Sequence, residues 1–268
     1  MIISSMSLDG LDLMSRDYYF HLSGLQDINK DVVTSDLTVD GEAWGRSKNK
    51  PKTLVLDGCI TTYTAAAEWA LNRVLGRNGL KKLVINNKYQ CQVEVTSRGS
   101  NADNSHIVTC QLTMPDPYLY ALNSQSIQLG VTYSTGVIFG AGKGVTFGAD
   151  KGVVFGVAAG ESGTLTNEGN ADTYPVITVI GTCSGISVKN VTTGEQISVS
   201  AVLDDSDTLV IDCRPATCGV YINGKPDIAL KTSPGWIHCP LGDNQFSFSR
   251  SSLQNKKHCT VELQSRWI

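Results

Sequence analysis

The chain has 268 residues, a length that corresponds to two domains of ordinary size, each able to form its own core. Its 22 Lys and Arg nearly balance its 25 Asp and Glu, and charged residues make up only 18% of the sequence, where about 25% is usual. This composition excludes a disordered chain and a broadly basic nucleic-acid-binding protein.

The start of the sequence lacks the basic and apolar regions of a secretory signal, because Asp9 and Asp12 lie among its first residues. The longest uninterrupted apolar run, 153–160, is far shorter than the roughly 20 residues that span a bilayer. We therefore expect synthesis in a cytoplasm and no membrane association.

Most of the sequence alternates apolar and hydroxyl side chains with a period of two, which is typical of half-buried antiparallel strands. The clearest windows are residues 177–180, 186–188, 197–200 and 246–249. Turn signals interrupt the pattern at Asp9-Gly10, Asp40-Gly41, Asp57-Gly58, Asn223-Gly224 and Gly242-Asp243-Asn244. Many short strands with regular turns predict sandwich or barrel domains.

Residues 62–75 have helical periodicity instead. Thr62 or Thr64 can serve as N-cap and Gly76 or Gly79 as the stop. The apolar positions at helical spacing are Ala66, Ala67, Ala70, Leu71, Val74 and Leu75. Cations that complement the helix dipole collect at the C-terminal end, namely Arg73, Arg77, Lys81 and Lys82. We expect one amphipathic helix packed on a sheet, and we favour a solvated helix end over a binding patch for the cations.

A repeat with a period of eight residues occupies 136–156, where Gly-Val-X-Phe-Gly begins at Gly136, Gly144 and Gly152. Because eight is even, one face of an extended chain carries Val137, Phe139, Val145, Phe147, Val153 and Phe155. Two interpretations have equal weight. The repeat is either a glycine-rich connector whose phenylalanines cover a neighbouring surface, or a small hairpin or meander that forms an oligomer contact.

The eight cysteines could form four disulfides, but they are too sparse for a disulfide scaffold, and several lie in strand-like runs. We favour reduced, buried thiols. A zinc site is less favoured still, because the closest pair, Cys213 and Cys218, has four residues between its members, and no second pair at ligand spacing or flanking His follows. The eight cysteines are Cys59, Cys91, Cys110, Cys183, Cys213, Cys218, Cys239 and Cys259.

No catalytic, cofactor-binding or metal-ligating residue is predicted. In the glycine-rich segment 140–144, Val137 stands where a P-loop needs its first glycine, and Gly144 stands where it needs Ser or Thr. No nucleophile–base pair can be assigned to the histidines, which are dispersed. They are His21, His106, His238 and His258. We expect no cofactor and no enzymatic activity.

Two other features have both a functional and a structural interpretation. The acidic cluster 204–207 could flank a calcium ion, but it lacks the Gly and the bidentate Glu of an EF-hand loop, so a solvated turn is favoured. Trp236 and Trp267 could stack on a sugar, as in a lectin. In alternating strands, however, a Trp is usually a core or interface residue.

Short motifs in the C-terminal half resemble a protein family. They are Asn167-Glu-Gly-Asn170, Tyr174-Pro-Val-Ile177, Asn190-Val-Thr-Thr-Gly194, Asp207-Thr-Leu-Val-Ile-Asp212 and Pro240-Leu-Gly-Asp-Asn244. In order and approximate spacing they resemble the second domain of the distal tail proteins of long-tailed, non-contractile bacteriophages. The N-terminal half resembles the same family less sharply, through an opening strand at 1–9, the Asp40-Gly41 turn with Arg46 beyond it, the helix, and Met114-Pro-Asp-Pro-Tyr118 at the domain's end.

The motifs themselves are typical of a scaffold. Asn190 to Gly194 predicts a hairpin turn, Pro175 suits the start of an edge strand, and Asp207 and Asp212 bracket a buried strand.

The resemblance implies a mainly β fold of two β-sandwich domains. Residues 1–126 would form the ring-forming N-terminal sandwich with its single packed helix, 127–157 the Gly/Phe connector, and 158–268 a galectin-like C-terminal sandwich. The connector departs from the family, which usually has a shorter Val-X-Phe segment here.

In function, the resemblance implies a structural component of the virion's tail tip. Six copies would form a ring that joins the tail tube protein to a baseplate, tail-associated hub or fibre protein, and in some phages holds a receptor-binding protein. A closed ring of identical subunits needs two different complementary patches on each subunit, and exposed sheet edges and the Phe repeat are the candidates. The alternative function is a carbohydrate-binding adhesin that recognises host cell-wall glycans.

Overall fold

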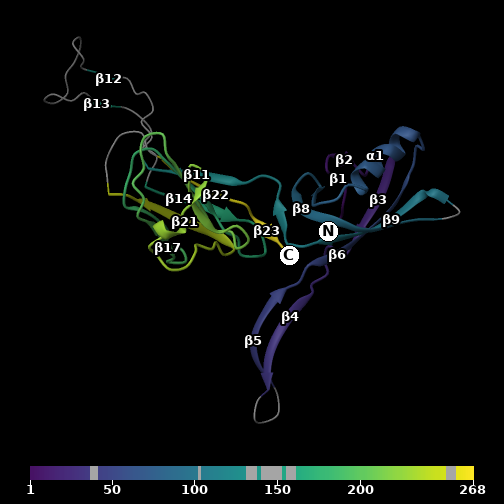
Figure 1. Cartoon of the computed structure of the whole chain (residues 1–268), viewed down its shortest axis with the longest axis horizontal. Coiled ribbons are helices and arrows are strands. Elements are labelled where there is room, and N and C mark those ends of the chain that lie inside the picture. The colour runs from purple at the N-terminus through teal and green to yellow at the C-terminus, as the bar shows by residue number, and fades with distance from the viewer. Residues whose placement is uncertain (37–41, 102–103, 131–137, 140–152, 155–160, 252–257) are drawn as a thin grey trace. The chain divides into compact units, whose positions relative to one another are not determined.

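The computed structural model describes residues 1–36, 42–101, 104–130, 138–139, 153–154, 161–251 and 258–268 (Figure 1). The chain forms two compact units, Met1–Asn123 with Arg266–Ile268, and Ser124–Ser265. The described residues are mainly β and contain one α-helix, which confirms the predicted secondary-structure class. Most of the repeat at 136–156 lies outside the described residues. Within it, β12 (Ile138–Phe139) pairs antiparallel with β13 (Val153–Val154).

The first unit is built on one antiparallel sheet with the strand order β2-β1-β7-β8-β9-β6-β3. A short strand, β10, pairs with β8 and with the last strand of the chain, β23. The strands are β1 (Met6–Leu8), β2 (Leu11–Asp12), β3 (Tyr18–Ser23), β6 (Lys52–Ile60), β7 (Lys81–Ile85), β8 (Tyr89–Asn101), β9 (Asn104–Met114), β10 (Leu119–Ala121) and β23 (Arg266–Trp267).

This sheet curls into a nearly closed barrel, where the sequence predicted a sandwich. The long strand β8 pairs with β7 over its first part and with β9 over its second part, and its register shifts between Val95 and Ser97. Such a bulge bends a strand, so one continuous sheet can turn back on itself. The amide of Leu13 bonds to the carbonyl of Met6, and the amide of Phe20 bonds to that of Leu13, so the two ends of the sheet approach each other.

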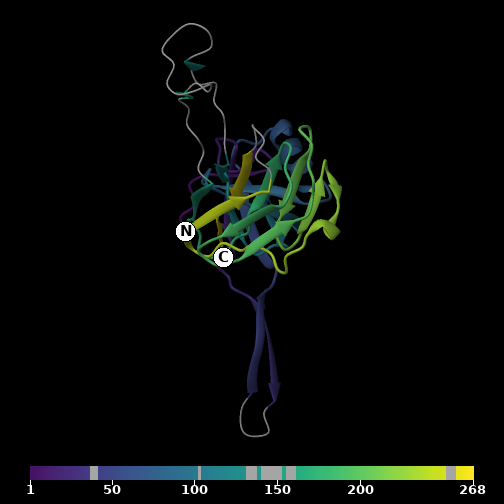
Figure 2. The same ribbon diagram turned by 90° about the vertical axis from the view of Figure 1, so that its left-hand side faces the viewer.

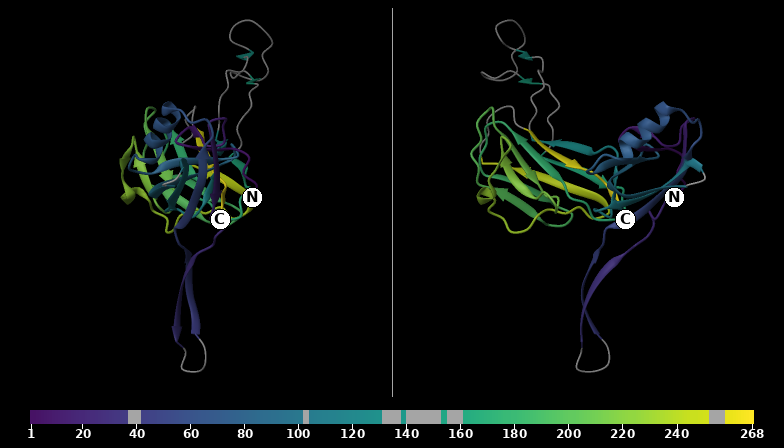
Figure 3. Two further views of the ribbon diagram at one scale, coloured as in Figure 1. Left: turned by 90° about the vertical axis from the view of Figure 1, so that its right-hand side faces the viewer. Right: turned by 45° about the vertical axis from the view of Figure 1, so that its right-hand side comes forward.

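Helix α1 (Ala65–Leu75) confirms the predicted helix and lies across this sheet (Figure 3). The hydroxyl of Thr64 accepts the amide of Ala67 at 3.1 Å and caps the first turn, and Gly76 ends the helix. Of the cations near its C-terminus, Lys81 is not solvated as predicted. It is fully buried, and its ammonium donates to the carbonyls of Arg77 at 2.6 Å and Gly79 at 2.9 Å.

The predicted turn at Asp57-Gly58 is wrong, because both residues lie inside strand β6. A Cβ atom on Gly58 would lie 2.3 Å from the carbonyl oxygen of Tyr19 and 2.6 Å from the Cα of Phe20. The glycine therefore allows β3 to lie close against β6 and does not reverse the chain.

A second feature of the first unit is a hairpin formed by β4 (Lys30–Asp36) and β5 (Glu42–Asn49). These two strands form a sheet of their own (Figures 1 and 2). Val32 and Val33 are about half exposed on it, at 53% and 47%. The predicted Asp40-Gly41 turn lies outside the described residues.

The second unit contains two antiparallel sheets around one core. The larger has the order β11-β22-β15-β18-β19-β20, and the smaller has the order β14-β21-β16-β17. The larger contains β11 (Gln125–Leu129), β15 (Val176–Ile180), β18 (Thr208–Asp212), β19 (Gly219–Ile222), β20 (Lys225–Pro226) and β22 (His258–Leu263). The smaller contains β14 (Ser162–Asn167), β16 (Ile186–Asn190), β17 (Gln196–Val199) and β21 (Gly242–Ser249), and a 3-10 turn, η1 (Ile228–Leu230), precedes β21.

Both sheets of the second unit contribute to its core, for example Ile177 and Val261 from the larger, and Val188 and Phe246 from the smaller. The four strand windows predicted from alternation correspond to β15, β16, β17 and β21 and are confirmed. Alternate burial along these strands follows from the period of two.

Two local predictions for the second unit need correction. The strand that follows Pro175 is not an edge, because β15 pairs with β18 on one side and β22 on the other. Pro175 precedes its first residue, where a missing N–H removes no ladder bond, and its carbonyl accepts the amide of Cys213. Gly242, predicted as part of a turn, begins strand β21 with φ +87°.

Candidate functional site

The asparagines of the C-terminal motifs converge on one segment of backbone, 238–242. The side-chain amide of Asn190 donates to the carbonyl of His238 at 3.0 Å and to Oδ1 of Asn244 at 3.1 Å. Asn244 donates to the carbonyls of Pro240 and Gly242, both at 2.9 Å. Two motifs that are about fifty residues apart in the sequence therefore act on a single stretch of chain.

Asn167 completes this arrangement from strand β14. Its amide donates to the carbonyls of Ala171 at 2.9 Å and Cys239 at 3.2 Å. Asn167, Asn190 and Asn244 are all at most 2% exposed. Buried amides of this kind stabilise only when their bonds are made, so the three side chains hold the segment in one conformation. We call Asn167, Asn190 and Asn244 the asparagine cluster.

The turn that contains Asn190 also follows the prediction. Oδ1 of Asn190 accepts the amide of Thr192 at 3.1 Å, and the amide of Gly194 bonds to the carbonyl of Asn190 at 2.8 Å. Gly194 has φ +79°, which a residue with a Cβ adopts only with strain. The motif is therefore a hairpin turn between β16 and β17 whose first residue also belongs to the asparagine cluster.

Asp212 ends strand β18 and fixes the loop that follows. Its carboxylate accepts two bonds from the Arg214 guanidinium, at 2.9 and 2.7 Å, and one from the Thr217 hydroxyl at 2.7 Å. Burial raises the pKa of this carboxyl, but the bonds from Arg214 and Thr217 outweigh burial and leave the pKa below its ordinary value. The prediction that Asp207 and Asp212 bracket a strand is confirmed, because β18 runs from Thr208 to Asp212.

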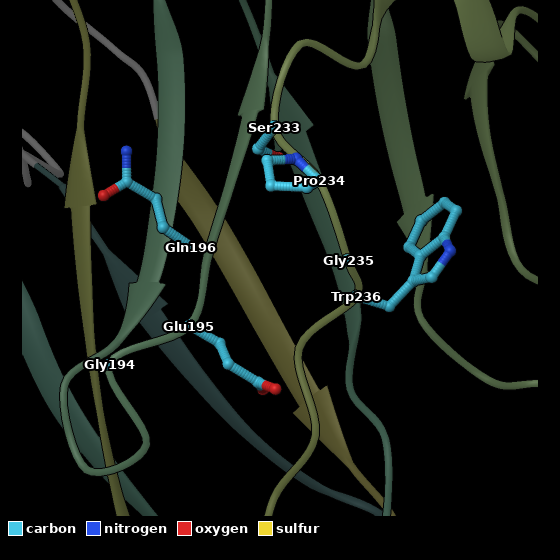
Figure 4. A pocket seen from close by; sticks show the side chains of 7 residues that line it. All are labelled: Gly194, Glu195, Gln196, Ser233, Pro234, Gly235 and Trp236. Atoms are coloured by element: carbon cyan, nitrogen blue, oxygen red, sulfur yellow. The ribbon is translucent and has the colours of Figure 1, made fainter.

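The second unit has a hollow of about 500 Å³ where the start of β17 faces the segment 233–236. It is lined by Gly194, Glu195, Gln196, Ser233, Pro234, Gly235 and Trp236 (Figure 4). Glu195 is directed to His238, whose Nδ1 lies 2.8 Å from Oε1 and whose backbone amide donates to Oε2 at 2.7 Å. The side chain of Trp236 points away from Gln196 (Figure 4).

The position of Trp236 favours the structural interpretation. The ammonium of Lys231 lies 4.9 Å from the ring centroid, and the indole also packs against the core of the second unit. A sugar could stack on the covered face only by displacing Lys231. Trp267 likewise packs against the core of the first unit and contacts Tyr89 edge-to-face at 4.9 Å.

All eight cysteines are free, and six of them are buried, as predicted. Burial raises the pKa of Cys91, Cys213 and Cys259 to about 12. A thiol with such a pKa is almost wholly protonated at neutral pH, and the thiolate is the nucleophilic form. These thiols therefore act as apolar core groups.

The remaining candidates are dispersed. In the acidic cluster, Asp207 accepts the amide of Asp204 at 2.8 Å and an amide proton of Asn223 at 2.8 Å, which are turn contacts. No group of three or more His, Cys, Asp or Glu suited to one metal ion occurs among the described residues. No helix in the described part of the chain is long and apolar enough to cross a membrane.

The chain is similar to known phage proteins. Residues 168–267 match the family model described as siphovirus-type tail component, C-terminal domain. The whole chain matches the crystal structure of SPP1 Dit, "a paradigm of hub adsorption apparatus in Gram-positive infecting phages", with TM-score 0.66 and 13% identity over 98% of this chain and 99% of that one. This match shows a shared fold.

Two weaker matches are chains in structures of the phage p2 baseplate in its activated conformation. The structure with Sr has TM-score 0.47 and 9% identity, over 96% of this chain and 97% of that one. The structure with Ca has TM-score 0.46 and 8% identity, over 98% of each chain. A comparison with curated protein sequences gave no match.

These findings define the chain as a structural, non-enzymatic component of a bacteriophage tail, located in the virion. Residues 168–267, which include the asparagines at 190 and 244, match the C-terminal domain of the siphovirus-type tail components, and SPP1 Dit has the same fold as the chain. The resemblance inferred from the sequence motifs is thereby confirmed.

Proposed function

We propose that six copies of the chain form a ring at the tip of the tail, between the tail tube protein and the baseplate or fibre hub. The first domain, predicted at 1–126, would close the ring. The connector at 127–157 would lead to a galectin-like second domain at 158–268, which in some phages would hold a receptor-binding protein. The shared fold with SPP1 Dit over 98% of the chain supports this proposal.

The observation that carries the ring is the β4–β5 hairpin. It pairs with no other strand among the described residues and exposes Val32 and Val33. A two-stranded hairpin alone is marginally stable in water, so an element of this kind gains stability from a partner surface. A contact between a hairpin and a different patch on the next copy is heterologous, and heterologous contacts that close generate rings.

Negative-stain electron microscopy and light scattering of the purified full-length chain test the ring. We expect closed particles with six-fold symmetry. Replacing 30–49 by a short turn is expected to give a monomer whose barrel unfolds at nearly the same temperature, since the hairpin lies outside the main sheet. A chain that remains monomeric at high concentration and forms no rings would contradict the proposal.

The alternative function, a sugar-binding adhesin, has less support. Its best candidate, Trp236, has one ring face covered by Lys231. A glycan array with Trp236→Ala as control tests it, and we expect equal, background-level signals from both proteins.

A further inference from the structure

Residues 266–268 belong to the first unit, although the whole second unit, Ser124–Ser265, separates them from it in the sequence. Their strand, β23, pairs antiparallel with β10. The indole of Trp267 packs against the core of the first unit and contacts the ring of Tyr89 edge-to-face at 4.9 Å. The first unit is therefore complete only when the chain has returned to it. We call residues 266–268 the clasp.

Arg266 connects the clasp to the root of the β4–β5 hairpin. Its guanidinium lies 4.0 Å from the centroid of the Tyr118 ring, the shortest cation–π contact among the described residues. The hydroxyl of Tyr118 accepts a bond from the side-chain amide of Asn49 at 2.9 Å. Because Asn49 is the last residue of β5, these two contacts join the clasp to the hairpin.

Few other contacts hold this root within the described part of the chain. The amide of Lys50 bonds to the carbonyl of Asn29 at 2.8 Å, and the buried ammonium of Lys52 donates to the carbonyl of Leu25 at 2.8 Å. Oδ1 of Asn49 is buried and has no partner among the described residues. The hairpin pairs with no other described strand, so these contacts at its root set the direction in which it projects.

The length of the hairpin amplifies any movement at its root. The β4 and β5 strands have seven and eight residues, and at about 3.3 Å per residue they extend roughly 25 Å. A rotation of about 10° at the root moves the far ends of these strands by roughly 4 Å. Such a shift exceeds what a closely packed protein interface accommodates.

We propose that the clasp is a conformational device that controls assembly: through Arg266 and Tyr118 it fixes the root of the hairpin, so that a subunit enters the ring only after 266–268 have docked. The inference rests on the proposed ring and adds a control on when a subunit can join it. A cation–π contact and one hydrogen bond are each weak. A first unit without the clasp therefore keeps its barrel but loses the fixed direction of its hairpin.

The order of synthesis gives this device its use. At about 5–20 residues per second, the second unit takes roughly 7–28 s to make after the bulk of the first unit has left the ribosome. During this interval the first unit lacks the clasp, and its hairpin is not aligned for a contact with another copy. Chains without a complete second unit are thereby kept out of the ring.

Tyr118→Phe tests the link, because it removes the hydroxyl that Asn49 binds and keeps the ring beneath Arg266. In hydrogen exchange of the full-length chain followed by mass spectrometry, peptides covering 25–36 and 42–52 are expected to exchange about threefold to tenfold faster, the factor that corresponds to one hydrogen bond. Peptides of β8 and β9 are expected to stay unchanged. The concentration for half-maximal ring assembly is expected to rise at least threefold, because every contact around a closed ring carries the same defect.

Arg266→Ala separates a link through Tyr118 from a general loss of stability. Alone, it is expected to speed exchange of the same hairpin peptides at least twofold. The double variant is expected to match Tyr118→Phe alone, since both substitutions break one path. Effects on hairpin exchange that multiply fully in the double variant would overturn the inference, because Arg266 would then not act through Tyr118.

Tyr221→Phe is the matched control, because the hydroxyl of Tyr221 also makes a bond, to the carbonyl of Thr217 at 3.2 Å, but lies in the second unit. It is expected to leave hairpin exchange and assembly unchanged. A chain that ends at Ser265 lacks the clasp altogether, and it is expected to form no rings while peptides of β3, β6 and β9 keep their protection.

The outcomes separate the clasp from the ring. Rings that form at the usual concentration from the chain ending at Ser265, or hairpin peptides that exchange normally in Tyr118→Phe, would overturn the inference and leave the proposed ring intact. An unmodified chain that forms no rings would instead overturn the proposed function. Hairpin exchange in Tyr118→Phe would then decide by itself whether the clasp fixes the root.

Discussion

At the scale of single residues, the side chains that identify the family also hold a loop in place. Asn190 donates two bonds and accepts one while fully buried. A buried polar group that loses its partner costs its full desolvation energy, so the removal of one amide affects several groups at once.

Asn190→Ala is therefore expected to lower the free energy of unfolding of the second unit by about 3 kcal/mol, since it leaves three partner groups unsatisfied, of which the amide of Asn244 is fully buried. Hydrogen exchange followed by mass spectrometry is expected to show faster exchange in peptides covering 190–196 and 236–245. Peptides of the first unit are expected to stay unchanged. The control is Asn78→Ala at an exposed position, which should change stability by less than about 0.5 kcal/mol. Equal effects of the two substitutions would refute this role of the asparagine cluster.

Asp212 makes the stability of the second unit depend on pH. Its pKa in the folded chain lies below the ordinary value of 3.8. The folded state therefore favours the ionised form, and this stabilisation is complete above the unfolded-state pKa and is lost as the pH falls through the folded-state pKa.

Asp212→Asn is expected to cost about 2 kcal/mol at pH 7, where charge-assisted bonds to Arg214 and Thr217 are lost. The difference from the unmodified chain should shrink as the pH is lowered from 5 toward 3. Urea unfolding at a series of pH values measures it. If the difference in the free energy of unfolding stays constant over this range, ionisation of Asp212 does not contribute to the stability of the second unit.

At the scale of elements, the close approach of β3 and β6 depends on Gly58. Because a Cβ at this position would meet the backbone of β3, Gly58→Ala is expected to destabilise the first unit by about 3 kcal/mol, at the upper end of overpacking effects. Gly99→Ala is the matched control, since its nearest neighbour would lie 3.9 Å from the new Cβ. Thermal unfolding of both variants is the measurement, and similar midpoints would contradict the steric argument.

Other elements show how local signals succeed and fail. Thr64, Gly76 and the apolar spacing between them define α1 because a helix is decided by neighbours along the chain. Asp57-Gly58 is a residue pair that is common in turns. Its glycine instead allows close contact with β3, a strand about forty residues away in sequence. Lys81 is a charged residue near a helix end, where solvent exposure is the local expectation. In the folded chain its ammonium donates to two carbonyls of the segment that follows α1. Sequence windows contain no information about such distant partners.

At the scale of the whole molecule, the sequence alone determined the mainly β class, the helix after Thr64, the burial of most cysteines as free thiols, and the resemblance to siphovirus-type tail components. These properties follow from periodicity, composition and short motifs, all of which are signals from residues that are close together in the sequence. Only the tertiary structure decided that the first unit is a nearly closed barrel, that Asn167, Asn190 and Asn244 meet at one segment, and that Trp69 remains exposed. These properties depend on which strands pair across long separations, and pairing is fixed by packing of the complete chain rather than by any window of it.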